Sequence, residues 1–183
     1  MKLIECVPNI SEGRNKDIIN QIIQPIKDNH NVHLLDVDSG YDTNRTVITF
    51  IGDPYSVIDT VFDLIKNASK LINMSNHKGE HQRMGATDVC PLIPISNVSI
   101  KECINYSKQL ASKVAKELNI PVYLYEYSAS IKFRKNLANI RKGQYEGMFD
   151  KIKLKEWKPD YGKAENHIKS GVTAIGAREF LIA

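Results

Sequence analysis

Val32-His-Leu-Leu-Asp-Val37 and Thr46-Val-Ile-Thr-Phe-Ile51 are two runs rich in β-branched and aromatic residues, and the polar segment Asp38 to Arg45 separates them. Such residues favour strands, and a polar segment between two such runs is typical of a connection between neighbouring strands. The stretch from position 32 to position 51 therefore predicts a strand pair. This pair decides the fold, because helical patterns lie on both sides of it.

Isoleucines recur at helical spacing before the strand pair, which predicts a helix from about Asn15 to Ile26. Pro54 begins a second helix after the pair, with apolar residues on one side as far as Leu71. The chain opens with the apolar run Leu3 to Val7, which predicts a strand that ends at Pro8. The first part of the chain thus has the order β, α, β, β, α.

A polar segment, Asn73 to Asp88, follows the second helix and predicts a long loop, because it lacks sustained apolar periodicity. Val89 to Ile95 predicts the next strand, and its two prolines favour an irregular strand or one at the edge of the sheet. Ser99 and Glu102 form a capping-box pattern at the start of a third helix. Pro121 to Tyr125 predicts a strand after that helix.

The order of these elements predicts the fold class. Strands and helices in the order β, α, β, β, α, β, α, β fit an α+β fold, a ferredoxin-like α/β sandwich with helices packed on one mainly antiparallel sheet. Ser128 to Lys158 predicts a mixture of helix and loop, and Glu179 to Ala183 is strand-like. For a chain of 183 residues we expect one domain.

The composition, 42% hydrophobic and 25% charged, is typical of a soluble globular domain. No apolar run approaches the roughly 20 residues of a membrane span. Glu5 and Pro8 interrupt what would be the apolar core of a signal peptide. The three cysteines are widely spaced, with no CxxC pair, and predict buried free thiols. We therefore expect a cytoplasmic protein with no membrane partner.

A basic stretch from Lys132 to Lys142 contributes much of the net charge of +4. Such a stretch could bind an anion, although solvated helix faces account for most runs of this kind. It contains no recognised nucleic-acid motif. We expect no nucleic-acid partner.

The loop His77-Lys-Gly-Glu-His-Gln-Arg-Met-Gly-Ala86 carries the strongest chemical signal. Imidazole exchanges protons in both directions near neutral pH, so His81, beside Glu80 and Arg83, is a candidate general acid or base. The spacing of His77 and His81 could also suggest zinc, but a glycine lies between them and no motif marks a third ligand. We expect no metal. The alternative, that these side chains are solvated loop residues, stays open.

Two further polar segments follow predicted strands. Asp36 and Asp38 alternate along a strand and share one face near its end, where carboxylates can orient a histidine or bind a metal. The alternative is an Asx turn that caps the following loop. Asn9-Ile-Ser-Glu-Gly13 offers backbone donors beside a helix start, which suits an anionic group; the alternative there is an ordinary helix cap.

Taken together, these segments resemble the formiminotransferase domain of glutamate formimidoyltransferases and formimidoyltransferase-cyclodeaminases. The stretches that carry the resemblance are Glu5 to Gly13, Leu34 to Gly40, Thr43 to Val47, Met74 to Pro91, Pro121 to Tyr125, Glu156 to Gly162 and Gly176 to Ala183. The resemblance runs from one end of the chain to the other. It implies that residues 1–183 are the N-terminal subdomain of such a domain, with the C-terminal subdomain absent from this chain.

The resemblance implies transfer of a formimino group from N-formiminoglutamate to N5 of tetrahydrofolate, a step of histidine breakdown that feeds one-carbon metabolism. The family's catalytic histidine falls on His81, and Asp38 is the expected partner that orients it. The resemblance also places substrate or folate contacts at Asn9, Glu80, Arg83, Gly162 and Gly171. Tetrahydrofolate is the co-substrate, and no metal or redox cofactor is expected, because folate itself accepts the carbon unit.

Members of this family join two similar subdomains and bind folate between them, so the resemblance implies a C-terminal subdomain or a partner chain that supplies the other half. A homodimer is a further implication of the family. Two alternatives stay open. The chain could be a catalytically silent folate-binding or assembly subunit, or a formyltransferase that uses 5-formyltetrahydrofolate and glutamate.

Overall fold

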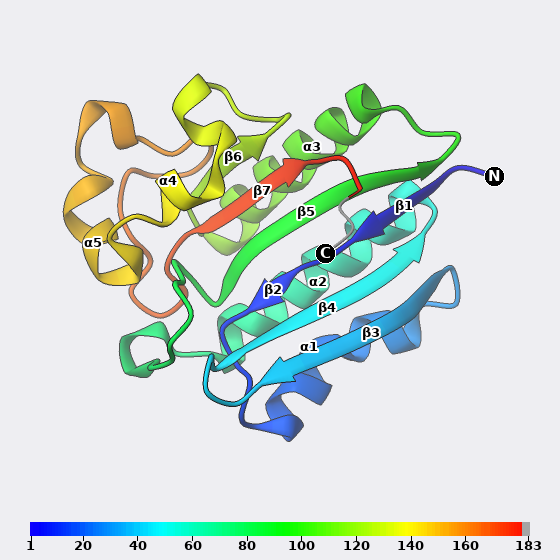
Figure 1. Cartoon of the computed structure of the whole chain (residues 1–183), viewed down its shortest axis with the longest axis horizontal. Coiled ribbons are helices and arrows are strands. Elements are labelled where there is room, and N and C mark those ends of the chain that lie inside the picture. Colours follow the sequence, from blue (N-terminus) through cyan, green and yellow to red (C-terminus); the bar gives the residue numbers. More distant parts are fainter. Residues whose placement is uncertain (181–183) are drawn as a thin grey trace.

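The computed structural model describes residues 1–180, in which the strands form a sheet with helices packed against it (Figure 1). The strands are β1 Leu3–Cys6, β2 Asn9–Ile10, β3 Val32–Gly40, β4 Arg45–Gly52, β5 Thr87–Ser96, β6 Val122–Glu126 and β7 Thr173–Ala177. The α-helices are α1 Lys16–Asp28, α2 Pro54–Leu71, α3 Ile100–Leu118, α4 Leu137–Arg141 and α5 Gln144–Lys151. Three short 3-10 helices are η1 Met74–Asn76, η2 Lys132–Lys135 and η3 Lys155–Trp157.

All seven strands form one sheet, in which β3 pairs with β4, β1 and β2 lie between β4 and β5, and β7 lies between β5 and β6. The pairings from β3 to β5 are antiparallel, whereas β5, β7 and β6 are parallel to one another. The antiparallel part, with α1 and α2, has the ferredoxin-like βαββαβ order. The prediction of an α+β fold on a mainly antiparallel sheet is confirmed, and the parallel strands extend it.

The sequence favours an irregular strand or an edge strand here, and the structure places β5 inside the sheet, where it pairs with β1 and β2 on one side and with β7 on the other. The irregularity is confirmed. Pro8 lies between β1 and β2, and Pro91 of β5 lies opposite this break. The Pro91 carbonyl accepts from the Val7 N–H at 3.3 Å. Proline has no N–H to donate, so the ladder is interrupted there and resumes where Asn9 pairs with Val89.

The three long helices begin where the sequence predicts. The side chain of Asn15 caps α1 by accepting from two backbone N–H groups, and Asp53 caps α2 directly before Pro54. Ser99 and Glu102 complete the capping box at the start of α3. Helices α1, α2 and α3 cover one face of the sheet and bury the main core there (Figure 1).

The other face of the sheet is covered at one end and open at the other. Helices α4 and α5 lie beside β6 and β7 (Figure 1), and a second core forms beneath them. Its buried members are Met84, Val89, Tyr123, Tyr125, Ile140, Met148, Ile152, Val172 and Ala174. In β4, Ile48 and Phe50 are buried toward the long helices, while Val47 and Thr49 on the other face are partly exposed.

Three more sequence expectations concern an internal segment, the C-terminal segment and the thiols. Ser128 to Lys158 does mix helix with loop. Of the strand-like segment Glu179 to Ala183, residues 179 and 180 form no strand, and residues 181–183 lie outside the described part of the chain. The three cysteines are buried and free, as expected.

Candidate active site

The loop between η1 and β5 is tied to the turn between β3 and β4. The side chain of Asn44 accepts from the Gly13 N–H at 3.0 Å and donates to the Lys78 carbonyl at 2.9 Å. A Cβ at Gly79 would come within 2.4 Å of the Thr43 carbonyl oxygen, so the loop backbone packs directly on that turn. Glycine at this position allows the close approach.

His77 and Arg83 hold this loop together. His77 Nε2 lies 2.9 Å from the Asn44 carbonyl oxygen, and Nδ1 accepts from Arg83 Nε at 3.1 Å. The guanidinium of Arg83 also donates to Gln144 and to both carboxylate oxygens of Glu146 on α5. Both ring nitrogens of His77 and the Arg83 guanidinium therefore have protein partners. Burial lowers the pKa of His77 below its ordinary value.

His81 differs from His77 in the same loop. Its Nδ1 is buried and has no hydrogen-bond partner among residues 1–180. Burial lowers the pKa of His81 below its ordinary value of 6.5, and the nearby guanidinium groups of Arg45 and Arg141 lower it further. The imidazole is therefore neutral at neutral pH and able to accept a proton.

Arg45, the first residue of β4, donates a hydrogen bond to the side-chain oxygen of Asn9 on β2. Its Nε is buried and without a hydrogen-bond partner in the described part of the chain. Burial lowers the pKa of Arg45, and the neighbouring Arg141 lowers it further. The predicted site residue Asn9 thus orients a guanidinium group next to His81.

Asp88 and Arg141 form a second polar pair beside His81. The Asp88 side chain is 2% exposed, accepts from the Met84 N–H at 2.7 Å and accepts from Arg141 Nε at 2.9 Å. This pair links α4 to the end of the histidine loop. Sequence reasoning missed Arg45, Asp88 and Arg141 as site residues, although Arg45 lies in a family-like stretch and Arg141 in the basic stretch where an anion could bind.

Other predicted site residues make no hydrogen bond to His81 Nδ1 within residues 1–180. Asp38 is exposed on β3 and pairs with Val47 across the strands, and it does not supply a partner to that nitrogen. The Glu80 side chain is exposed, while its backbone N–H donates to the Asp42 carbonyl at 3.1 Å. Their roles in binding or catalysis stay predictions.

The segment between Gly162 and Gly171 joins the histidine loop at one end. Both glycines have positive φ, 92° and 68°. A Cβ at Gly171 would come within 2.1 Å of the Met84 carbonyl oxygen, and Gly171 forms a β-bridge with Gly85. This segment also borders a cavity of about 420 Å³. The residues that line it are Asn119, Lys163, Glu165, Asn166, His167, Ile168 and Lys169.

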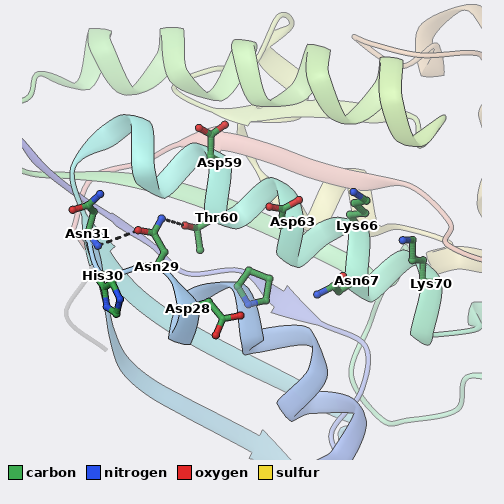
Figure 2. A pocket seen from close by; sticks show the side chains of 11 residues that line it. Asp28, Asn29, His30, Asn31, Asp59, Thr60, Asp63, Lys66, Asn67 and Lys70 are labelled. Atoms are coloured by element: carbon green, nitrogen blue, oxygen red, sulfur yellow. Dashed lines mark hydrogen bonds between the residues drawn. The ribbon is translucent and has the colours of Figure 1, made fainter.

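A larger cavity of about 750 Å³ lies between α1 and α2 on the helical side of the molecule (Figure 2). Carboxylates of Asp28, Asp59 and Asp63 line it together with Lys66 and Lys70 (Figure 2). Within residues 1–180, no three His, Cys, Asp or Glu side chains are arranged to hold a metal ion. The cavity is separate from His81, so its size does not mark the candidate active site.

The fold and the site define an α+β domain with a neutral loop histidine flanked by two guanidinium groups. The chain belongs to the family described as "Formiminotransferase domain, N-terminal subdomain", whose model matches residues 3–178.

None of the helices in the described part of the chain combines the length and apolar character that a membrane span requires.

Curated relatives match the chain along its whole length. It is 48% identical to the formimidoyltransferase-cyclodeaminase of Dictyostelium discoideum and to the glutamate formimidoyltransferase of Streptococcus pyogenes serotype M1, in both cases over 100% of this chain. It is also 48% identical to the formimidoyltransferase-cyclodeaminase of Rattus norvegicus. The chain spans 34% of the length of the first and third of these relatives and 61% of the second.

Proposed function

We propose that this chain is the catalytic-histidine half of a glutamate formimidoyltransferase, which transfers the formimino group of N-formiminoglutamate to N5 of tetrahydrofolate. The observation that carries the proposal is His81, a neutral imidazole whose buried Nδ1 lacks a protein partner in the described part of the chain. The names of the relatives supply the reaction class. Free cysteines agree with the reducing cytoplasm as the location.

His81 would act as both general base and general acid. The folate N5 attacks the formimino carbon and must lose its proton, which the neutral imidazole accepts. The glutamate nitrogen must gain a proton as its bond to that carbon breaks, and the imidazolium donates it. One residue thereby returns to its starting state after each transfer. No metal is required for these proton transfers.

The segment from Gly162 to Gly171 is the proposed folate contact. Its cationic side chains Lys163 and Lys169 suit the carboxylates of the folate tail, and the side-chain oxygen of Asn166 is buried and lacks a partner within residues 1–180. Contact between Gly171 and the Met84–Gly85 backbone connects this segment to the histidine loop. These contacts support folate binding by the same chain that carries His81.

A C-terminal subdomain, or a partner chain that replaces it, would complete the site. The sheet face formed by β1, β2 and β4 adjoins His81 and leaves apolar side chains such as Val47 and Ile51 partly exposed. We expect the C-terminal subdomain to cover this face. The length of the relatives agrees with a second part.

The test is turnover of N-formiminoglutamate and tetrahydrofolate by the purified chain, alone and with a C-terminal subdomain, followed by absorbance after acid conversion to the methenyl form. Activity in either case supports the proposal, and 5-formyltetrahydrofolate with glutamate tests the formyl alternative. Folate binding without turnover in both cases would favour the silent binding or assembly subunit. Gel filtration of the same samples tests the homodimer.

A further inference from the structure

We propose that Arg45 and Arg141 form a binding site for the α-carboxylate of the amino-acid donor, beside His81. The inference rests on the proposed function, because it assigns a group of that donor. It adds two residues that the family resemblance does not place in the site.

The sheet register brings the two arginines together. Asn9 on β2 pairs with Val89 on β5, and neighbouring strands lie only about 4.8 Å apart. Asn9 accepts a hydrogen bond from Arg45, and Asp88, the residue before Val89, accepts from Arg141. The two guanidinium groups are therefore held by acceptors on adjacent strands, at the boundary between the open and the covered parts of the sheet.

The carboxylates of Asp38 and Asp88 lie close enough to Arg45 to favour its charged form, and the charge of Arg141 opposes them. Asp88 is already engaged by Arg141 and by the Met84 N–H. No ion pair of residues 1–180 includes Arg45. Arg45 Nε is buried without an acceptor, and a buried donor without a partner is costly. A carboxylate is the group that satisfies a guanidinium donor with the best geometry and charge.

The chemistry of the donor favours its α-carboxylate over the folate tail. In N-formiminoglutamate the nitrogen that leaves is bonded to the same carbon as the α-carboxylate. Because His81 must reach that nitrogen to protonate it, the α-carboxylate necessarily lies beside His81 as well. The carboxylates of folate are separated from N5 by the aminobenzoyl group. Only the donor can place a carboxylate and the reacting nitrogen together at this point.

The test is binding of unreactive N-formyl-L-glutamate to the full chain, followed by NMR titration of the His81 ring. A bound carboxylate next to the imidazole stabilises its protonated form, so we expect the ligand to raise the pKa of His81. Arg45→Met should weaken binding about tenfold or more and abolish this rise, because a charge-assisted hydrogen bond is lost. Lys113→Met, which removes a cation on α3 across the sheet, should bind normally.

Two further ligands distinguish the sources of the carboxylate. N-Formyl-4-aminobutyrate, which lacks the α-carboxylate, should leave the pKa of His81 unchanged. If p-aminobenzoylglutamate binds and raises that pKa while N-formyl-L-glutamate does not, the site belongs to the folate tail and the proposal is overturned. Equal binding of N-formyl-L-glutamate by Arg45→Met and the unmodified chain also overturns it.

The fold of the variant and the proposed function are controlled separately. Circular dichroism checks that Arg45→Met folds, and Arg45→Lys, which keeps the charge with fewer donors in fixed geometry, should bind with intermediate affinity. A guanidinium–carboxylate contact would be contradicted if Arg45→Lys bound as weakly as Arg45→Met, or as tightly as the unmodified chain. The NMR measurement requires no turnover. If His81→Ala keeps full turnover, the proposed function fails whatever the binding result.

Discussion

In the parallel half, β7, β6 as far as Tyr125 and β5 as far as Ile93 are buried on both faces, whereas β4 alternates strictly between buried and partly exposed residues. The parallel half of the sheet lies between α3 on one face and α4 with α5 on the other. The antiparallel half has helices on one face alone. His81, Arg45 and Asp88 lie where these halves meet. The side chains of Arg45 and Asp88 are held at this boundary by hydrogen bonds to Asn9 and Arg141.

The largest expected effect is on catalysis at the boundary. His81→Ala should reduce turnover of the complete enzyme by about 10²–10⁴-fold, because the proton transfers lose their acid and base. Its melting temperature should stay near that of the parent, since His81 Nδ1 has no protein partner within residues 1–180. His77→Ala in the same loop is the matched control and should mainly lower stability, because its ring has two partners. Near-normal turnover in His81→Ala would contradict the assignment.

The two halves of the sheet can be compared directly at Val89 and Val47, which pair with Asn9 from either side and face the same way. Val89→Glu should cost about 3–5 kcal/mol, because it buries an unpaired charge beneath α4 and α5. Val47→Glu should change the stability of the chain far less, since its side chain is partly exposed, and should weaken association with a C-terminal subdomain. Urea unfolding measures the first effect. If both substitutions lower the free energy of unfolding equally, the two halves of the sheet are covered to the same extent.

A smaller loss of stability is expected when the polar pair at the boundary is broken. Asp88→Asn should cost roughly 2 kcal/mol, because Arg141 and the Met84 N–H lose a charged acceptor. Asp150→Asn removes a carboxylate from the exposed pair Lys153–Asp150, and its midpoint in urea should not move measurably. The same small shift in both variants would mean that the Asp88–Arg141 pair contributes no more than a surface pair.

The smallest expected effect is on pH dependence. His81 must be neutral to accept a proton, and burial and two guanidinium groups lower its pKa, so the acidic limb of kcat/KM should lie below pH 6.5. Arg45→Met removes one positive charge and should raise that pKa, which moves the limb to higher pH. A pH–rate profile measures the shift, with Lys113→Met as the unchanged control. A limb that moved to lower pH would contradict the electrostatic role of Arg45.

Much of the fold could be predicted from local patterns. The strand pair at positions 32–51, the cap at Asn15, the helix start at Pro54 and the capping box at Ser99 all depend on residues close together in the sequence. Strand β7 is absent from the sequence predictions, and the prolines of β5 leave open whether that strand lies inside the sheet or at its edge. The neighbours of β5 in the sheet are strands that lie far from it in the sequence, and the residues of β5 do not specify them.

The candidate site divides in the same way. A loop that contains His81 between two glycines was recognisable as a chemical signal without any structure. The sequence did not reveal the polar neighbours of His81, which are Arg45, Asp88 and Arg141. These residues are held by hydrogen bonds between distant positions: 36 positions separate Asn9 from Arg45, and 53 separate Asp88 from Arg141. Asp38, chosen by alternation along a strand, shares the sheet with Arg45 and Asp88, and its role beside His81 stays a prediction.

The sequence by itself determined the three long helices, their caps, the βαββαβ order and the identity of the loop histidine, because periodicity, capping and side-chain chemistry are properties of neighbouring residues. Only the tertiary structure decided which face of the sheet stays open and where β7 enters. It also decided that His81 is neutral, because its pKa depends on burial and on charges at Arg45 and Arg141. Those charges come from a strand and a helix that only the folded sheet brings together.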